Sequence, residues 1–202
     1  MTEPEDMIPE QQSGIATNTE SSASFESSKD AEHFYEQVRE RLLQVNGWHD
    51  LAGAATARFW LTDAAGNEVA REARQGDHFK ISIPGPGSFT GEGYDWVRIE
   101  EIEEKNEAGH RSVAIRVRPS PNPLNADPDV AHFFDPEATS CFMAKLEGNT
   151  VIAAVYGRNE KPNTGAVERL TDKIRNAAVA AGAIGGFSKI QWKSLVNGLV
   201  SR

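Results

Sequence analysis

The residue types best suited to chemistry in this chain lie in two long connections rich in glycine and proline. The first connection, residues 83–97, reads Ile-Pro-Gly-Pro-Gly-Ser-Phe-Thr-Gly-Glu-Gly-Tyr-Asp-Trp-Val. Glycine permits positive φ angles and close approach to the backbone, whereas proline fixes φ, so we expect this glycine loop to have a defined shape. Shaped loops commonly carry binding sites. The candidate ligand-binding residues that this loop contributes are Gly85, Gly87, Phe89, Gly91, Tyr94, Asp95 and Trp96.

The spacing of these glycines excludes two common kinds of phosphate-binding loop. Gly85, Gly87 and Gly91 give the pattern G-x-G-x-x-x-G, and the segment after them is predicted to be a strand, unlike a dinucleotide-binding fingerprint. No Gly-Lys-Ser or Gly-Lys-Thr follows, so the segment is not a P-loop. Two interpretations stay open, namely backbone N–H groups that bind an anion and a purely structural connection between strands.

Two titratable residues are candidates for acid/base chemistry. His132 lies in the second connection, residues 119–139, between Asp129 and Asp135, either of which would orient its ring. Asp95 is flanked by two aromatic residues, and burial among them would raise the pKa of its carboxyl group. Local hydrogen bonding to the backbone is the commoner role for both residues. No nucleophile motif accompanies them, so the catalytic residues stay unknown and a non-enzyme is favoured.

Two arginines are candidates for binding an anion. Arg116 and Arg118 alternate along a predicted strand and therefore share one face of it. Such a pair grips a carboxylate or phosphate when that face lines a cavity. The acidic segment 100–107 offers the alternative of ion pairs between neighbouring strands, which is the interpretation we favour.

The elements that must position these residues form a predicted antiparallel sheet with helices at both ends. Between residues 54 and 156, alternating apolar residues predict six or seven strands. One helix is predicted to begin near Ser27 and to end at Gly47. Two more helices are predicted after the strands, and the second of these is short and amphipathic. The chain is therefore predicted to be α+β, with a curved antiparallel sheet or partial β-barrel, one N-terminal helix and two C-terminal helices. This order is similar to that of helix-grip ligand-binding folds, although no motif assigns the chain to such a family.

The first 28 residues differ in composition from the rest of the chain. They are polar, hold six acidic residues and contain no Lys or Arg. Segments of this kind bury too little apolar surface to offset the entropy of ordering. We predict a disordered acidic tail over residues 1–28 and a single domain over residues 29–202.

Composition limits the compartment and the partners. A net charge of −9 argues against a dedicated nucleic-acid-binding protein. The single cysteine, Cys141, excludes an internal disulfide and fits a reducing compartment, and no signal peptide or membrane-spanning segment is evident, so a cytoplasmic location is expected. The histidines lack metal-ligand spacing, and we expect neither a metal nor a cofactor.

The favoured function is a soluble, non-catalytic binding module whose surface combines the glycine loop with the second connection. Its partner would be a small apolar or anionic ligand, or another protein, since the two connections carry most of the unpaired aromatic residues. The alternatives are a small acid/base enzyme that uses His132 and Asp95, and a structural subunit that forms a homo-oligomer through its C-terminal helices.

Overall fold

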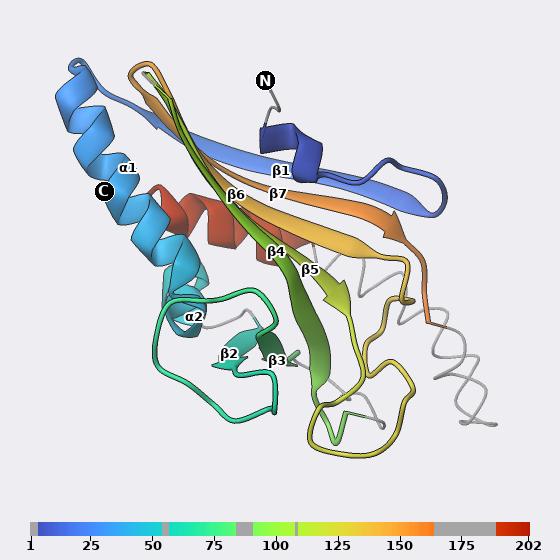
Figure 1. Ribbon diagram of the computed structural model, residues 1–202. Coiled ribbons are helices and arrows are strands. Elements are labelled where there is room, and N and C mark those ends of the chain that lie inside the picture. The colour runs from blue at the N-terminus through green and yellow to red at the C-terminus, as the bar shows by residue number, and fades with distance from the viewer. Residues whose placement is uncertain (1–3, 54–56, 84–90, 108, 164–188) are drawn as a thin grey trace.

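A curved, seven-stranded antiparallel sheet organises the computed structural model, which describes residues 4–53, 57–83, 91–107, 109–163 and 189–202 (Figure 1). The spatial order of the strands is β1-β7-β6-β5-β4-β3-β2, so the first and second strands of the chain form the two edges. The predicted α+β class with a curved antiparallel sheet is confirmed. The strands are β1 (Ile15–Ser24), β2 (Arg58–Thr62), β3 (His78–Ser82), β4 (Asp95–Glu107), β5 (His110–Pro119), β6 (Thr139–Glu147) and β7 (Thr150–Glu160).

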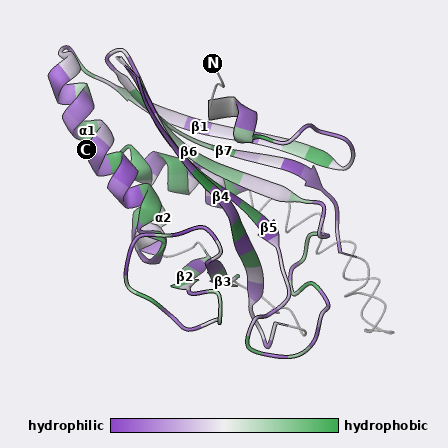
Figure 2. Ribbon diagram, viewed as in Figure 1, coloured by the Kyte–Doolittle hydropathy of each residue, from purple (hydrophilic) through white to green (hydrophobic). Residues whose placement is uncertain are grey.

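Helices lie before and after the run of strands from β2 to β7. The longest described helix is α1 (Ser28–Leu43), where Ser27 caps the N-terminus by accepting a hydrogen bond from the Asp30 N–H at 3.1 Å, as its spacing predicts. Figure 2 shows hydrophilic and hydrophobic residues alternating around this helix, as expected for one buried face. The remaining helical segments are η1 (Pro4–Met7), η2 (Val45–Gly47), α2 (Trp48–Ala52) and a C-terminal helix over residues 189–199.

The predicted helices differ from the observed ones in two respects. The short helix α2 was not predicted, because five residues are too few to show a helical period. Of the two predicted C-terminal helices, the second is confirmed at residues 189–199, whereas the first, predicted over residues 166–181, lies outside the described residues.

Side-chain alternation gives the sheet one apolar concave face. In β2, Phe59 and Leu61 point into the core whereas Arg58 and Trp60 point away from it, as predicted. The tight hairpin between β6 and β7 is also confirmed, because Glu147 pairs with Thr150 and leaves a two-residue turn. The concave face is therefore continuous from β2 to β7 and packs against α1, α2 and the C-terminal helix.

The N-terminal segment corrects the sequence-based prediction of a disordered tail over residues 1–28. Residues 15–24 form β1, which pairs with β7 along its whole length, so the domain begins well before residue 29. The strand is rich in Ser and Thr, and Thr19 is its one buried residue, so it lacks the apolar alternation that marks a strand in sequence. Its stability comes from the backbone ladder with β7. The strand predicted at Val69 is reduced to an isolated bridge between Thr62 and Glu68, so the total of seven includes β1 in its place.

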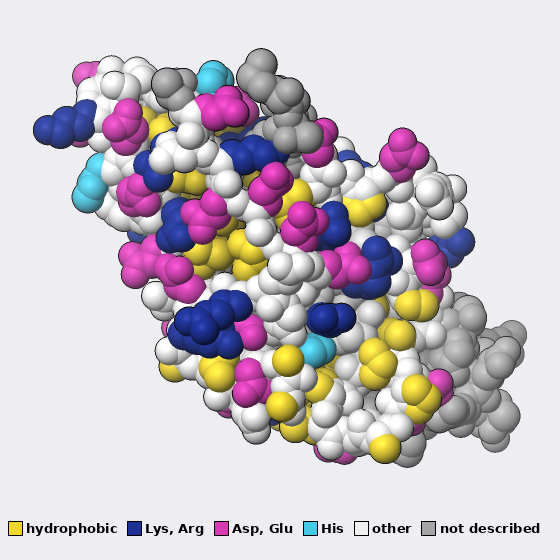
Figure 3. Space-filling view, in the orientation of Figure 1, with side chains coloured by type: hydrophobic (Ala, Val, Ile, Leu, Met, Phe, Trp, Pro, Cys, Tyr) yellow, Lys and Arg dark blue, Asp and Glu magenta, His cyan; other side chains and the backbone are white. Residues whose placement is uncertain are grey.

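The convex face of the sheet carries charged side chains and a small second core. Met7 of η1 packs there with Cys141 and Met143, and burial raises the pKa of the Cys141 thiol to about 12. Cys141 is fully buried, as expected for a structural thiol. In Figure 3, acidic and basic side chains lie next to one another across the molecule, which indicates that much of this surface is satisfied by ion pairs.

Candidate functional site

A cavity of about 50 Å³ lies on the concave face, where the sheet, the second connection and the C-terminal helix meet. Strands β2 to β6 supply inward-pointing side chains to its wall. Those side chains are almost all apolar, and they are Phe59, Phe79, Ile81, Val97, Val117, Ser140 and Phe142. We call this space the concave cavity.

The second connection closes one side of the concave cavity with three consecutive rings. His132 stacks on Phe133 with ring centroids 4.3 Å apart, and Phe133 contacts Phe134 at the same centroid distance. Backbone hydrogen bonds hold this segment in place: Trp96 N–H donates to the Ala131 carbonyl at 2.7 Å, and Asn163 N–H donates to the Phe133 carbonyl at 2.8 Å. The rings are therefore part of a fixed wall.

The protonation of His132 follows from its surroundings. Its Nδ1 accepts a hydrogen bond from the Phe134 N–H at 3.0 Å, and burial lowers the pKa of the ring to about 3. The imidazole is therefore neutral near pH 7, and with Nδ1 as the acceptor its proton is assigned to Nε2. His132 is thus suited to donate a hydrogen bond and poorly suited to act as a general base.

Asp95 shares the concave face with the cavity wall. It pairs with Ile81 and lies two residues before Val97, so its side chain has the same facing as both. Burial raises the pKa of its carboxyl group to about 7, although a hydrogen bond from the Phe133 N–H opposes the shift. The structure therefore brings Asp95 to the backbone beside His132, as the acid/base interpretation requires.

The glycine loop is only partly described, because residues 84–90, including Gly85, Gly87 and Phe89, lie outside the described residues. At Gly91, an added Cβ would overlap the Tyr94 carbonyl oxygen, so the turn requires glycine there. Trp96 points to the convex side and is 1% exposed. The ring of Tyr94 lies beside Lys80, whose Nζ is 4.3 Å from the ring centroid. Tyr94, Asp95 and Trp96 therefore do not form one site, because Asp95 faces the concave side of the sheet and Trp96 faces the convex side.

The two connections do meet in space. Besides the Trp96–Ala131 hydrogen bond, Ser120 N–H donates to the Trp96 carbonyl at 3.0 Å, and Ala131 N–H donates to the Ser120 carbonyl at 3.0 Å. The second connection is therefore hydrogen-bonded to the start of β4 through Ser120 and Ala131. This contact joins His132 to Asp95 but leaves Tyr94 outside the concave cavity.

Arg116 and Arg118 lie on the convex face, away from the concave cavity. Arg118 Nε contacts Glu100 Oε1 at 2.6 Å, and Arg116 Nε contacts Glu100 Oε2 at 3.1 Å. Burial tends to raise the pKa of Glu100, but the two guanidinium groups outweigh it and lower that pKa. Arg116 also pairs with Glu101 at 3.0 Å. The favoured interpretation of ion pairs across neighbouring strands agrees with these contacts.

Gln191 and Trp192 of the C-terminal helix line the cavity, although the sequence did not mark them as ligand-binding residues. The sequence places Gln191 in a capping box with Ser188, which lies outside the described residues. In the structure its Oε1 instead accepts a hydrogen bond from the Ala57 N–H at 2.7 Å. This contact spans 134 residues of sequence, so no local pattern reveals it.

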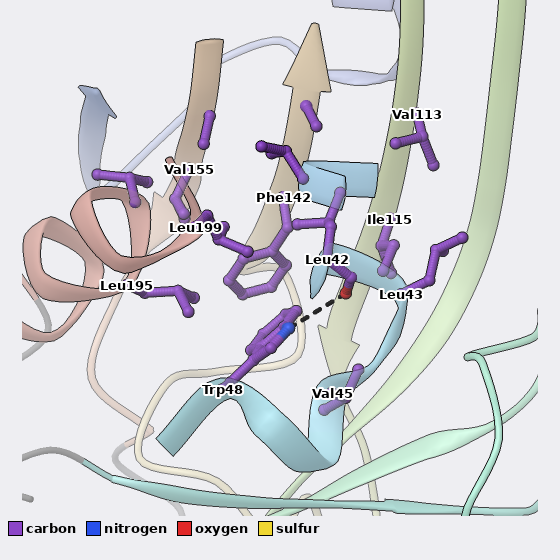
Figure 4. Close-up of a cluster of buried hydrophobic side chains, with 14 of the residues drawn as sticks. Leu42, Leu43, Val45, Trp48, Val113, Ile115, Phe142, Val155, Leu195 and Leu199 are labelled. Atoms are coloured by element: carbon purple, nitrogen blue, oxygen red, sulfur yellow. Dashed lines mark hydrogen bonds between the residues drawn. The ribbon is translucent and has the colours of Figure 1, made fainter. Parts of the chain in front are cut away.

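The apolar stripe of the C-terminal helix is turned into the protein's own core. Leu195, Val196 and Leu199 are fully buried among residues of the concave face (Figure 4). Side chains buried in this way are not available to a twin chain, so these three residues do not form the surface that the structural-subunit alternative expects on this helix. The first predicted C-terminal helix lies outside the described residues.

In the described parts of the chain, no group of three His, Cys, Asp or Glu side chains is placed to hold a metal ion. The same residues contain no helix of the length and apolar character needed to cross a bilayer.

Comparisons with known proteins leave the site to be interpreted from its own residues. No protein-family model matches the chain, and no match was found among curated proteins. Among solved structures, truncated norcoclaurine synthase from Thalictrum flavum aligns over 96% of this chain and 99% of its own, with 10% identity and a TM-score of 0.36. The same enzyme in complex with dopamine and hydroxybenzaldehyde aligns over 88% of this chain and 85% of its own, with 12% identity and a TM-score of 0.35. Likenesses at these TM-scores carry no argument about function.

Proposed function

We propose that this protein is an intracellular, non-catalytic binding protein that takes a small, uncharged and mainly apolar molecule into the concave cavity. The observation that carries the proposal is the composition of the cavity wall. Six of its described residues are Phe or Trp, and only His132, Ser140 and Gln191 bring polar side-chain groups other than an indole N–H. Small-molecule sites are typically concave and apolar, with a few placed polar groups.

The charge of the wall favours an uncharged ligand over an anionic one. None of the described lining residues carries a permanent charge, and His132 is kept neutral by burial. The arginines that would hold an anion are paired with Glu100 on the other face of the sheet. A buried ion without a counter-charge would be strongly disfavoured in this setting.

The size of the concave cavity limits the ligand to a small molecule. One water requires about 10–15 Å³ measured in this way, so a volume of about 50 Å³ has room for roughly four waters. The engineered cavity of about 150 Å³ that binds benzene is roughly three times larger, so even a single unsubstituted ring enters the concave cavity only if its wall moves outward. We therefore take benzene as the first probe.

The test is a titration of the protein with benzene followed by ligand-observed NMR. Ser140→Leu places a larger side chain in the cavity wall and is expected to weaken benzene binding at least ~10-fold, since the apolar space is filled. Ser82→Leu makes the same substitution on a strand face that points away from the cavity and should leave binding unchanged. If the unaltered protein binds neither benzene nor a cyclic ketone or alkene of similar size, the proposal fails.

A second candidate function, an acid/base enzyme, is favoured by one observation at Asp95. Its carboxyl group has a pKa raised to about 7 and lies on the same face as the cavity wall. Groups that titrate near neutrality suit proton transfer. Asp95 would exchange the proton, and His132 would donate a hydrogen bond through Nε2. If benzene in the cavity leaves the ¹³C titration of the Asp95 carboxyl unchanged, Asp95 is not beside the ligand and the enzyme is excluded.

A further inference from the structure

Gln191 brings an unpaired hydrogen-bond donor to the wall of the concave cavity. The side chain is 2% exposed, and its Oε1 is occupied by the Ala57 N–H at 2.7 Å. That contact assigns the amide orientation, because an N–H requires the oxygen opposite it. The Nε2 group is then left as a buried donor, and no described residue offers it an acceptor.

Trp192, the next residue, brings a second unpaired donor. Its ring packs against Phe142 at a centroid distance of 5.1 Å and against Phe59 at 6.1 Å. Its Nε1 atom is buried and has no hydrogen-bond partner within the described parts of the chain. Buried indole N–H groups usually find an acceptor, as that of Trp48 does with the Leu42 carbonyl at 3.1 Å.

The polar groups of the cavity wall are therefore unbalanced toward donors. Gln191 offers Nε2, Trp192 offers Nε1, and neutral His132 carries its proton on Nε2. Buried donors without acceptors lower stability, and such groups in native proteins are commonly satisfied by a ligand or by water. Gln191 Oε1 and His132 Nδ1 already accept from backbone N–H groups, so among the described lining side chains only the Ser140 hydroxyl could act as a further acceptor.

We infer that the ligand of the concave cavity is a small, uncharged molecule with a hydrogen-bond acceptor oxygen, such as a ketone, aldehyde or ether, which receives the Nε2–H of Gln191. Trp192 Nε1 supplies the second donor. The inference rests on the proposed function and adds the ligand class to it. A ligand of this kind loses its hydrogen bonds to water on entry and regains them from the two donors, whereas a hydrocarbon of equal shape leaves the donors unpaired.

The test uses cyclohexanone and methylenecyclohexane, which differ by an oxygen in place of a CH₂ group. The measured quantity is the dissociation constant of methylenecyclohexane divided by that of cyclohexanone. Gln191→Met removes the donor at similar side-chain length, and its sulfur remains a weak acceptor for the Ala57 N–H. We expect the ratio to fall about 10-fold in Gln191→Met, because one buried hydrogen bond is lost from the ketone alone.

Trp192→Phe keeps an aromatic ring against Phe142 and removes the indole N–H together with the five-membered ring. The added space affects both probes, which have nearly the same shape, so the ratio of their dissociation constants reports on the lost donor. The ratio is expected to fall here too, by about 3-fold, whereas Trp60→Phe, on the opposite face of the sheet, should leave it unchanged. If both probes bind and the ratio is the same in all four proteins, the acceptor inference is overturned while the ligand-binding function stands. If neither probe nor benzene binds, the proposed function itself is overturned.

Discussion

Two tryptophans lie in parts of the concave core that differ in packing. We call the closely packed surroundings of Trp48 the filled half and the surroundings of Trp192, which border the concave cavity, the cavity half. Trp48 is fully buried, contacts Phe59 and Phe142 at centroid distances of 5.5 and 4.7 Å, and donates its Nε1–H to the Leu42 carbonyl (Figure 4). Trp192 contacts the same two phenylalanines from the C-terminal helix, but it is half-buried, borders the concave cavity and has an unpaired Nε1–H.

The difference shows what separates a structural core from a binding site. Trp48 packs against the rings of Phe59, Phe79 and Phe142, and the one polar atom of its own ring is satisfied. Around Trp192, the wall includes His132 and Gln191 as well as empty space. Close packing without voids is what stability alone favours, so an unfilled space with unpaired donors indicates a role other than stability.

Replacing each tryptophan by alanine should give the largest difference in the free energy of unfolding between the two halves. Trp48→Ala is expected to cost about 3–5 kcal/mol of the free energy of unfolding, because it empties a closely packed part of the core. Trp192→Ala should cost less than half as much, since the ring is half-buried and already borders a cavity. Denaturant unfolding measures both values. Equal losses would mean that the two halves are packed alike.

Asp95, which is buried near the cavity half, should make the stability of the protein depend on pH between pH 4 and pH 8. The raised pKa means that, between pH 4 and 7, the folded state holds a proton that the unfolded state releases, so stability falls as the pH rises through this range. Asp95→Asn removes this effect and should be the more stable protein at pH 8. The pKa is raised by about three units, and at about 1.4 kcal/mol for each unit the difference between the two proteins should change by roughly 4 kcal/mol from pH 4 to pH 8.

Unfolding free energies of both proteins across that pH range provide the measurement. Parallel curves for the unaltered protein and Asp95→Asn would show that the Asp95 carboxyl titrates normally and is not buried as described.

Two matched substitutions on one strand, each of which adds one methylene group, should compare the packing of the two halves with the smallest change. Val113 and Val117 point to the same face of β5, and Val117 alone lines the concave cavity. Val113→Ile adds a methylene to a filled region and should cost about 1 kcal/mol, whereas Val117→Ile should be neutral or slightly stabilising because it enters empty space. Thermal unfolding under identical conditions compares the two, and the reverse order would contradict the assignment of the halves.

The sequence predicted the sheet because its inner strands obey a local rule. Phe59 and Leu61, or Val113 and Val117, alternate with polar residues, and this period of two is visible without a structure. Strand β1 was missed because backbone pairing with β7 carries it and its side chains are mostly polar. Local patterns report side-chain burial, so an edge strand with little burial is invisible to them.

The candidate site was predicted only in part, for a similar reason. Asp95 and His132 stood out by residue type, and the structure brings their segments together through the Phe133 N–H. Gln191 was missed because its partner, Ala57, is 134 residues away in sequence. Arg116 and Arg118 attracted attention by their spacing, yet that spacing also suits the ion pairs with Glu100 that the structure contains.

The most direct test of the cavity half is an NMR titration of protein labelled with ¹⁵N at tryptophan, with cyclohexanone as the probe. The four indole N–H resonances, from Trp48, Trp60, Trp96 and Trp192, report separate places in the fold. We predict that the Trp192 resonance moves the most, as its Nε1–H gains an acceptor, and that the Trp48 resonance stays in place because its donor is already bonded. A spectrum in which Trp192 does not move, or in which Trp48 moves as far, would contradict the account.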